Sequence, residues 1–140
     1  MLELANALKL LGDETRLRLL RLVAREPLNV SELTSILGLA QSGISRHLSL
    51  LRKAGLVEER KEGVWTYYQA PTQLHLTGAG LVGDGETALD GDLGTVWEFV
   101  RARLSEADDP FSDLPRLTEV LRQRDNFGGG LSEKLLEPGQ

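Results

Sequence analysis

The chain has 140 residues, 41% of them hydrophobic, which is enough for one compact domain with added helices and excludes a disordered chain. It contains no cysteine, so disulfides, thiolate metal sites and cysteine nucleophiles are excluded. The net charge of −5 is unevenly divided: residues 1–70 carry 10 basic and 8 acidic side chains, whereas residues 71–140 carry 6 and 13. The basic excess of the first half permits nucleic-acid binding without proving it.

No targeting or membrane segment is indicated. The N-terminus lacks a basic region ahead of an apolar run, and no stretch reaches about 18 consecutive apolar residues. We therefore expect a cytoplasmic protein that makes no membrane contact.

Two amphipathic helices and a short extended segment open the chain. Leucines at helical spacing predict a helix over residues 2–11, which Gly12 ends. Asp13 is the predicted N-cap of a second helix that runs to about residue 26. Residues 28–30 follow as an extended segment.

Two further helices with a tight turn between them are predicted within residues 31–54. The first runs from Ser31 to Leu37, Gly38 provides the turn, and the second runs from Gln41 to Ala54. The second helix is apolar on one face and carries small hydroxyl groups and cations on the other. Such side chains let a helix approach a phosphate or a base edge closely, although an ordinary solvated surface is the alternative. The polar face comprises Ser42, Ser45, Arg46, Ser49 and Lys53.

A β-hairpin is predicted over residues 56–70, because two alternating runs flank a turn that contains Gly63. For its aromatic side chains we favour cross-strand packing over base stacking. Arg60 and Lys61, next to the turn, are candidate phosphate contacts.

Residues 71–91 are rich in glycine, and residues 78–83 fit the pattern G-x-G-x-x-G. A dinucleotide site needs a strand before this pattern and a helix that opens within it, but Asp84 and Gly85 stand where the helix should run. The acidic residues of this segment also fail the spacing of a calcium loop. We interpret the segment as a loop.

Two more helices are predicted, at about residues 92–107 and 112–125. The first has a wide apolar stripe, and the spare apolar surface of the N-terminal helix is its natural partner in a twofold dimer. The second would extend this interface or cradle an effector. The predicted dimer interface comprises Leu4, Leu8, Leu93, Val96, Trp97, Val100 and Leu104.

Three segments carry a specific resemblance: they read DETRLRLL from Asp13, SRHLSLLRKAGLV from Ser45 and RKEGVWTYY from Arg60. In combination they resemble the ArsR family of bacterial repressors, over residues 4–70. The resemblance implies a mainly α fold with a small β-hairpin, that is, a winged helix-turn-helix with added N- and C-terminal dimerisation helices. It also implies a homodimer that represses by binding double-stranded operator DNA and leaves it when an effector binds.

The resemblance also implies roles for individual residues. Carried over by position, Gln41, Ser42, Ser45 and Arg46 would face the major groove. Ser49 and Lys53 would lie toward the DNA backbone, with Arg60 and Lys61 near it on the wing.

Two positions in or next to the predicted second helix, His47 and Ala40, are not among the predicted DNA contacts. His47 belongs to the matching segment, but it flanks the apolar face of its helix, so we expect it to be partly buried and structural. Ala40 stands where the family commonly has serine, which weakens the helix N-cap and shifts capping to Ser42.

Metal binding, cofactors and catalysis are not expected. Many relatives hold metal through cysteines or through Asp and His pairs, but this chain has no cysteine and its histidines are His47 and His75. No nucleophile, base and orienting group converge, so the chain is not expected to be an enzyme. Apolar space near Trp97 and Phe99 leaves room for a small organic effector.

The expected organisation has four parts. Residues 1–70 form the DNA-binding domain, 71–91 the Gly-rich loop, 92–126 the dimerisation helices and 127–140 a flexible tail or linker. The tail is similar to the connecting region of ArsR-type chains that continue into an S-adenosylmethionine-dependent methyltransferase. The alternative function is therefore a regulatory or protein-interaction winged-helix module of such a longer fusion protein.

Overall fold

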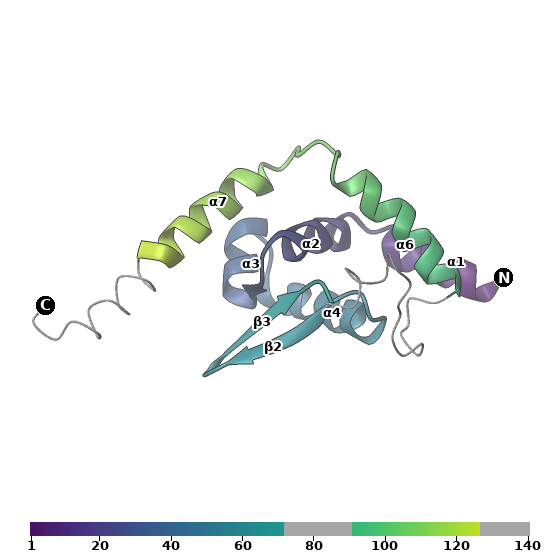
Figure 1. The fold of residues 1–140 in the computed structure, drawn as a ribbon, viewed down its shortest axis with the longest axis horizontal. Coiled ribbons are helices and arrows are strands. Elements are labelled where there is room, and N and C mark those ends of the chain that lie inside the picture. Colours follow the sequence, from purple (N-terminus) through teal and green to yellow (C-terminus); the bar gives the residue numbers. More distant parts are fainter. Residues whose placement is uncertain (72–90, 127–140) are drawn as a thin grey trace, which may run out of the picture.

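A computed structural model describes residues 1–71 and 91–126 of the chain (Figure 1). The Gly-rich segment and the tail predicted from the sequence therefore lie almost wholly outside the described residues. The elements, in chain order, are α1 Leu2–Leu11, α2 Glu14–Arg25, β1 Leu28–Asn29, α3 Val30–Leu37, α4 Gln41–Lys53, β2 Glu58–Glu62, β3 Trp65–Gln69, α6 Gly91–Leu104 and α7 Asp113–Arg124.

The fold is a winged helix-turn-helix, as the sequence predicts. Helices α3 and α4 are joined at Gly38, whose φ of +70° lies in the left-handed region that favours glycine. Strands β2 and β3 form the wing, and Gly63 with a φ of +63° lies in its turn. The predicted hairpin is extended to a three-stranded antiparallel sheet of order β1-β3-β2, because Leu28 pairs with Tyr68.

The helix N-caps agree only partly with the predictions. The Asp13 side chain accepts a hydrogen bond from the Arg16 N–H at 3.0 Å, which confirms it as the cap of α2. The prediction that α3 begins at Ser31 is wrong by one residue, because Asn29 is the N-cap and forms a reciprocal capping box with Glu32.

Helix α4 starts without a side-chain cap. Its N-cap is Ala40, so the predicted shift of the cap to Ser42 is wrong. The first N–H groups of any helix lack intrahelical acceptors, and since no side chain caps those of α4, this end of the helix has donors available for another partner.

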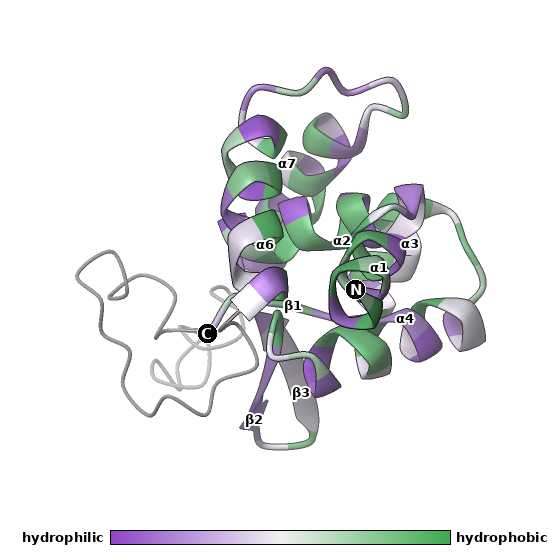
Figure 2. Cartoon of the chain, turned by 90° about the vertical axis from the view of Figure 1, so that its right-hand side faces the viewer, coloured by the Kyte–Doolittle hydropathy of each residue, from purple (hydrophilic) through white to green (hydrophobic). Residues whose placement is uncertain are grey.

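The core lies where α2, α3 and α4 meet. Leu19, Leu22, Ile36, Ile44 and Leu51 are fully buried there. Hydrophobic bands run along these helices, whereas strand β2 is hydrophilic (Figure 2). Burial of this kind stabilises the fold by roughly 1.5–3 kcal/mol for each large aliphatic side chain.

The two C-terminal helices arch over the winged-helix core and lie at opposite ends of it (Figure 1). Helix α6 packs along α1, and α7 packs on α3 and α2. The apolar side chains of α7, among them Leu114 and Leu117, are packed against the core of the same chain. This apolar face is therefore occupied within the chain, and the role of α7 in extending the interface or cradling an effector stays a prediction.

Candidate nucleic-acid interface

Helix α4 has two distinct faces, as its sequence predicts. Ile44, Leu48 and Leu51 are buried in the core. The opposite side is solvent-facing, and we call its predicted contact residues the reading face. They are Gln41, Ser42, Ser45, Arg46 and Lys53, which are exposed, and Ser49, which is half-buried.

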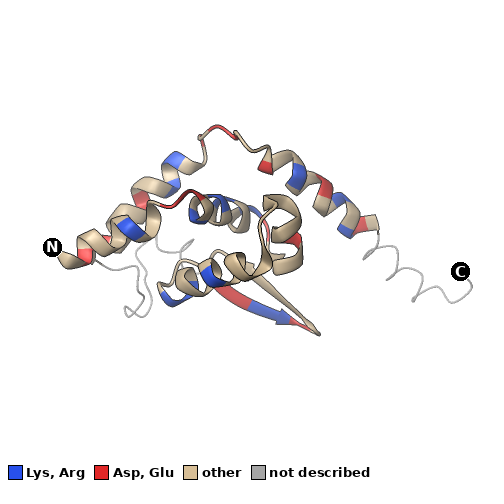
Figure 3. Ribbon diagram, turned by 180° about the vertical axis from the view of Figure 1, so that it is seen from behind, with Lys and Arg blue, Asp and Glu red and all other residues tan. Residues whose placement is uncertain are grey.

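The cations of the reading face have no internal partner. Neither Arg46 nor Lys53 makes a hydrogen bond or an ion pair within the described parts of the chain. Figure 3 shows Lys and Arg positions, in blue, along α4. Because these charges are not neutralised from inside, they are available to an anionic partner.

The wing has fewer unpaired cations than its sequence, with Arg60 next to Lys61, indicates. Arg60 is paired with Glu62, at 3.1 Å between Nη2 and Oε2, and its guanidinium lies 5.8 Å from the ring centre of Tyr67. Lys61 has no partner among the described residues, so it is the available cation of the predicted wing pair. Acidic and basic bands alternate along β2 (Figure 3).

The wing also contacts the C-terminal part of α4. Arg52 lies 3.6 Å from Glu59, between Nε and Oε2, and both side chains are partly exposed. The Tyr68 hydroxyl donates to the same Glu59 carboxylate at 3.3 Å. Burial, and then the negative charge of Glu59, raises the pKa of Tyr68.

The aromatic side chains of β3 divide between packing and exposure. Tyr68 packs against the core, which agrees with the prediction of packing over stacking. Trp65 is 52% exposed and lines a cleft of about 360 Å³ together with Gln41 and Thr34. An exposed tryptophan beside the first residue of α4 was not foreseen, because the sequence does not show what covers the end of the wing.

His47 holds the helix-turn-helix against the N-terminal helices. Its Nδ1 accepts a hydrogen bond from Arg16 Nε at 3.1 Å, and Arg16 Nη1 also donates to the carbonyls of Lys9 and Leu10 at 3.3 and 3.0 Å. His47 is half-buried. These contacts agree with the structural role predicted for it.

Comparison with known proteins places this arrangement in a family. Residues 13–59, which contain α2, α3 and α4, match the model described as bacterial regulatory protein, arsR family. The HTH-type transcriptional regulator MJ1325 of Methanocaldococcus jannaschii is 43% identical over 65 residues, which cover 46% of this chain and 73% of that protein. This chain belongs to the ArsR family of regulatory proteins.

Two other known proteins are similar to part of this chain. The arsenic resistance transcriptional regulator ArsR1 of Pseudomonas putida is 52% identical over 62 residues, covering 44% of this chain and 48% of that protein. The chain thus spans about half the length of this relative. The solved structure of reduced HlyU from Vibrio cholerae is 36% identical, covers 54% of this chain and 86% of its own, and superimposes with a TM-score of 0.45.

The residues predicted for the dimer interface of this chain fall into three groups according to their exposure. Leu4 and Leu8 on α1 are 38% and 54% exposed. Trp97, in contrast, is 3% exposed and belongs to the core of its own chain. The other predicted positions are half-buried against that core: Leu93, Val96, Val100 and Leu104.

Two exposed apolar side chains of α1 and α6 are absent from the predicted interface. Leu2 is 78% exposed and Phe99 is 67% exposed. Helical spacing assigned Trp97 and Val100 to the interface, but the structure directs Trp97 inward and leaves Phe99 in solvent. A solvent-exposed phenylalanine is a stronger candidate for contact with a second copy than a buried tryptophan.

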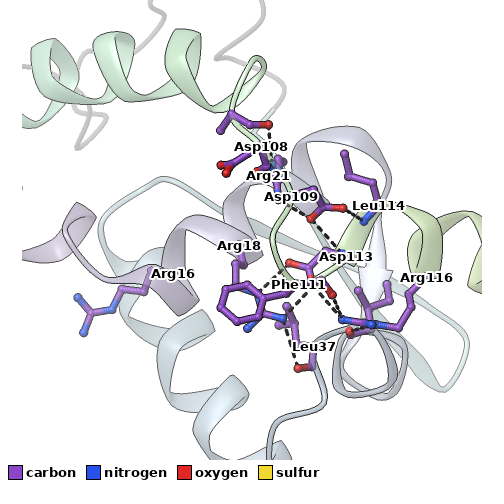
Figure 4. A network of polar contacts seen from close by, with 12 residues as sticks. Arg16, Arg18, Arg21, Leu37, Asp108, Asp109, Phe111, Asp113, Leu114 and Arg116 are labelled. Atoms are coloured by element: carbon purple, nitrogen blue, oxygen red, sulfur yellow. Dashed lines mark hydrogen bonds and ion pairs between the residues drawn. The ribbon is translucent and has the colours of Figure 1, made fainter.

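Three ion pairs hold α7 against α2 and α3, and we call their members the α7 anchor: Arg18 with Asp113, Arg21 with Asp109, and Arg124 with Glu32. Figure 4 shows the first two pairs. Asp113 is fully buried and receives two hydrogen bonds from Arg18, both at 2.8 Å. The Arg18 guanidinium lies 4.2 Å from the ring centre of Phe111. The hydrogen bond to Asp113 is the main reason that the pKa of Arg18 is raised.

Asp109 caps the start of α7 from the preceding loop. Its carboxylate accepts from the N–H groups of Asp113 at 3.0 Å and Leu114 at 2.9 Å, and from Arg21 Nη2 at 2.9 Å. Burial would raise the pKa of Asp109, but these hydrogen bonds and the Arg21 charge outweigh it and lower the pKa.

The other end of α7 is held by Arg124. This residue donates to both carboxylate oxygens of Glu32 at 3.0 and 2.6 Å and to the Pro27 carbonyl at 3.0 Å. Desolvation would lower the pKa of Arg124, but the contact with Glu32 outweighs it and raises the pKa. Helix α7 is therefore fixed to α2 and α3 at both ends.

Within residues 1–71 and 91–126, no three His, Asp or Glu side chains come together in a way that would hold a metal ion. In the same part of the chain, no helix has the length and apolarity needed to cross a bilayer.

Proposed function

We propose that this chain is a dimeric repressor that binds double-stranded operator DNA in the cytoplasm, has no catalytic activity, and is released by a small-molecule effector. The observation that carries the proposal is the state of the α4 cations. Arg46 and Lys53 have no internal partner among the described residues, whereas the arginines of the α7 anchor are paired. A surface with short polar side chains and unpaired cations suits contact with a nucleic acid.

Helix α4 would enter the major groove with its uncapped N-terminal end first. Gln41, Ser42, Ser45 and Arg46 would then reach base edges, with Arg46 placed for the two acceptors of a guanine. Ser49, Lys53, Arg60 and Lys61 would lie along the phosphates. Because Arg60 is paired with Glu62, we expect Lys61 to contribute more of the phosphate attraction.

A twofold dimer would present two copies of α4 to one face of DNA. Exposed apolar side chains of α1 and α6, including Leu8 and Phe99, support an interface between these helices of two chains. Two recognition helices in successive major grooves lie about 34–36 Å apart, so the operator should be an imperfect palindrome.

DNA binding is tested by fluorescence anisotropy with duplexes from the protein's own upstream region and shuffled duplexes of the same composition, at 50 and 200 mM salt. We expect specific binding that weakens steeply with salt. Arg46→Ala should cost about 1–3 kcal/mol on the specific duplex. Arg122→Ala on α7 is the matched control, since it removes an exposed helical arginine elsewhere and should leave affinity unchanged.

Two outcomes would count against this reading. Equal loss from Arg46→Ala on both duplexes would make Arg46 a phosphate contact without a role in sequence recognition. Equal affinity of the unmodified protein for both duplexes would contradict the repressor and favour a winged helix that contacts proteins.

The dimer is tested separately by light scattering. Phe99→Glu places a charge on an exposed position of α6 and should yield folded monomers. Val64→Glu, at a 91% exposed position of the wing, is the control and should stay dimeric. A dimer that persists in Phe99→Glu would remove α6 from the interface.

A further inference from the structure

A cavity of about 350 Å³ lies between α2 and α6. Its apolar wall comes from Leu20 and Ala24 of α2, Trp97 and Leu104 of α6, and Ala70 after the wing. The cavity is therefore bordered by α2 of the winged-helix core on one side and by α6, the helix that packs along α1, on the other. Its volume is in the range of cavities that hold small organic molecules.

The charged residues that line this cavity are all arginines. They are Arg21, Arg25 and Arg101, and no Asp or Glu is among the lining residues. Arg25 has no partner among the described residues. Arg101 forms an ion pair with Glu98, at 2.7 Å between Nη2 and Oε1, and both side chains are exposed. The whole protein has a net charge of −5, so a cavity whose charged lining residues are all cations stands out. Such a cavity favours an anionic ligand.

Two residues that line the cavity carry a buried N–H donor without an acceptor among the described residues. Arg21 is 7% exposed, and its Nη1 and Nη2 are bonded to Ala107, Asp108 and Asp109, yet its Nε has no partner in the described residues. Trp97 is 3% exposed, and its Nε1 is likewise unpaired there. Unsatisfied buried donors are rare because they cost free energy, so such a pair beside one cavity indicates a missing acceptor.

We propose that this cavity binds a small organic acid, one anionic group on an apolar body of about the size of one or two aromatic rings. Arg25 and Arg101 meet the anionic group at the mouth, and the apolar body lies on Ala24, Trp97 and Leu104. The Nε–H groups of Arg21 and Trp97 are buried, and they reach an acceptor of the ligand when these side chains shift toward the cavity.

The site also accounts for release from DNA, a consequence that rests on the repressor function proposed above. A ligand between α2 and α6 changes the fit of α6 on the winged-helix core. If α6 forms the dimer interface, the spacing of the two α4 helices changes with it. The ligand shifts this equilibrium only as far as its affinities for the two arrangements differ.

Binding is tested with a pair of fluorescent probes of the same body, the anionic 1-anilinonaphthalene-8-sulfonate and the neutral N-phenyl-1-naphthylamine. The full chain with Trp65→Phe is used, because it leaves Trp97 as the single tryptophan. We expect the anionic probe to bind more tightly than the neutral one and to quench Trp97 by energy transfer. Benzoate and octanoate should displace it, and benzyl alcohol should not.

Variants separate the cavity from other apolar surface. Arg25→Gln with Arg101→Gln should weaken the anionic probe by about tenfold and leave the neutral probe within about twofold. Arg122→Gln, which removes another exposed arginine paired with a glutamate three residues away, should change neither. Ala24→Phe should fill the cavity and abolish binding of both probes while Trp97 stays the single tryptophan, with an unchanged melting temperature as proof of folding.

Three results would overturn the proposal: equal affinity for the two probes, equal loss in Arg122→Gln, or retained binding in folded Ala24→Phe. Anisotropy with the DNA duplex keeps the repressor question separate. If the acids bind the cavity but DNA affinity does not change, the binding site stands and its role as the effector site is wrong. If no DNA binds at all, the repressor fails and the probe results still decide the cavity.

Discussion

The reading face of α4 and the α7 anchor use the same kinds of side chain in opposite ways. In the anchor, Arg18 and Arg124 are each bonded to a carboxylate at 2.8 Å or less. On the reading face, Arg46 and Lys53 have no partner in the described residues. The difference distinguishes cations that hold the fold together from cations that remain available to a partner, which residue type alone does not do.

The comparison also explains the uneven charge of the two halves. The arginines of α2 add to the basic excess of residues 1–70, and Asp109 and Asp113 add to the acidic excess that follows. In the structure these groups neutralise one another, because Arg18 pairs with Asp113 and Arg21 with Asp109. Part of the charge asymmetry therefore belongs to internal packing, and the proposed attraction for DNA depends on a few cations of α4 and the wing.

The strongest way to break the anchor is Asp113→Ala. It leaves Arg18, with 11% of its side chain exposed, without its carboxylate, so we expect a loss of about 3–5 kcal/mol in the free energy of unfolding. Urea unfolding followed by circular dichroism measures it. Asp108→Ala is the control, since that side chain is exposed, and should stay within about 0.5 kcal/mol. Equal effects of the two variants would mean that α7 contributes little to stability.

A smaller effect, with a defined pH dependence, is expected for Asp109→Asn. Because the pKa of Asp109 is lowered in the folded state, its contribution is full above the unfolded value of about 3.9 and is lost as the pH falls through the folded value. The variant should lose about 1–3 kcal/mol at pH 7 and converge with the unmodified protein in acid. Urea unfolding between pH 7 and pH 3 measures this, and a difference that grows in acid would contradict it.

Local features were predictable because they depend on neighbouring residues. The spacing of apolar residues gave the helix-turn-helix, the exposed side of α4 and the wing, and Gly38 and Gly63 marked turns that require a positive φ. What depends on distant residues was not predictable from one sequence. The pairing of Leu28 with Tyr68 and of Arg18 with Asp113, and the inward turn of Trp97, are of this kind.

The sequence predicts where the candidate site lies, but it does not predict which of its charged side chains are paired within the protein. Periodicity shows which side chains of α4 face solvent, yet it does not show that Arg60 is engaged by Glu62 while Lys61 is unpaired. Likewise, it does not show that Arg21 of α2 is neutralised by Asp109, from a loop more than 80 residues away. These are properties of the folded arrangement of charges.

The smallest predicted effect sharpens the comparison within the wing, where a paired and an unpaired cation are adjacent. Lys61→Gln should lower the slope of log affinity against log salt by about 1, because one phosphate contact is lost. Arg60→Gln should lower it by less, since its charge is already shared with Glu62 at 3.1 Å. Anisotropy at four salt concentrations measures both slopes. If Arg60→Gln has the larger effect, the Arg60–Glu62 pair opens on DNA, and internal pairing of an exposed cation does not remove it from the interface.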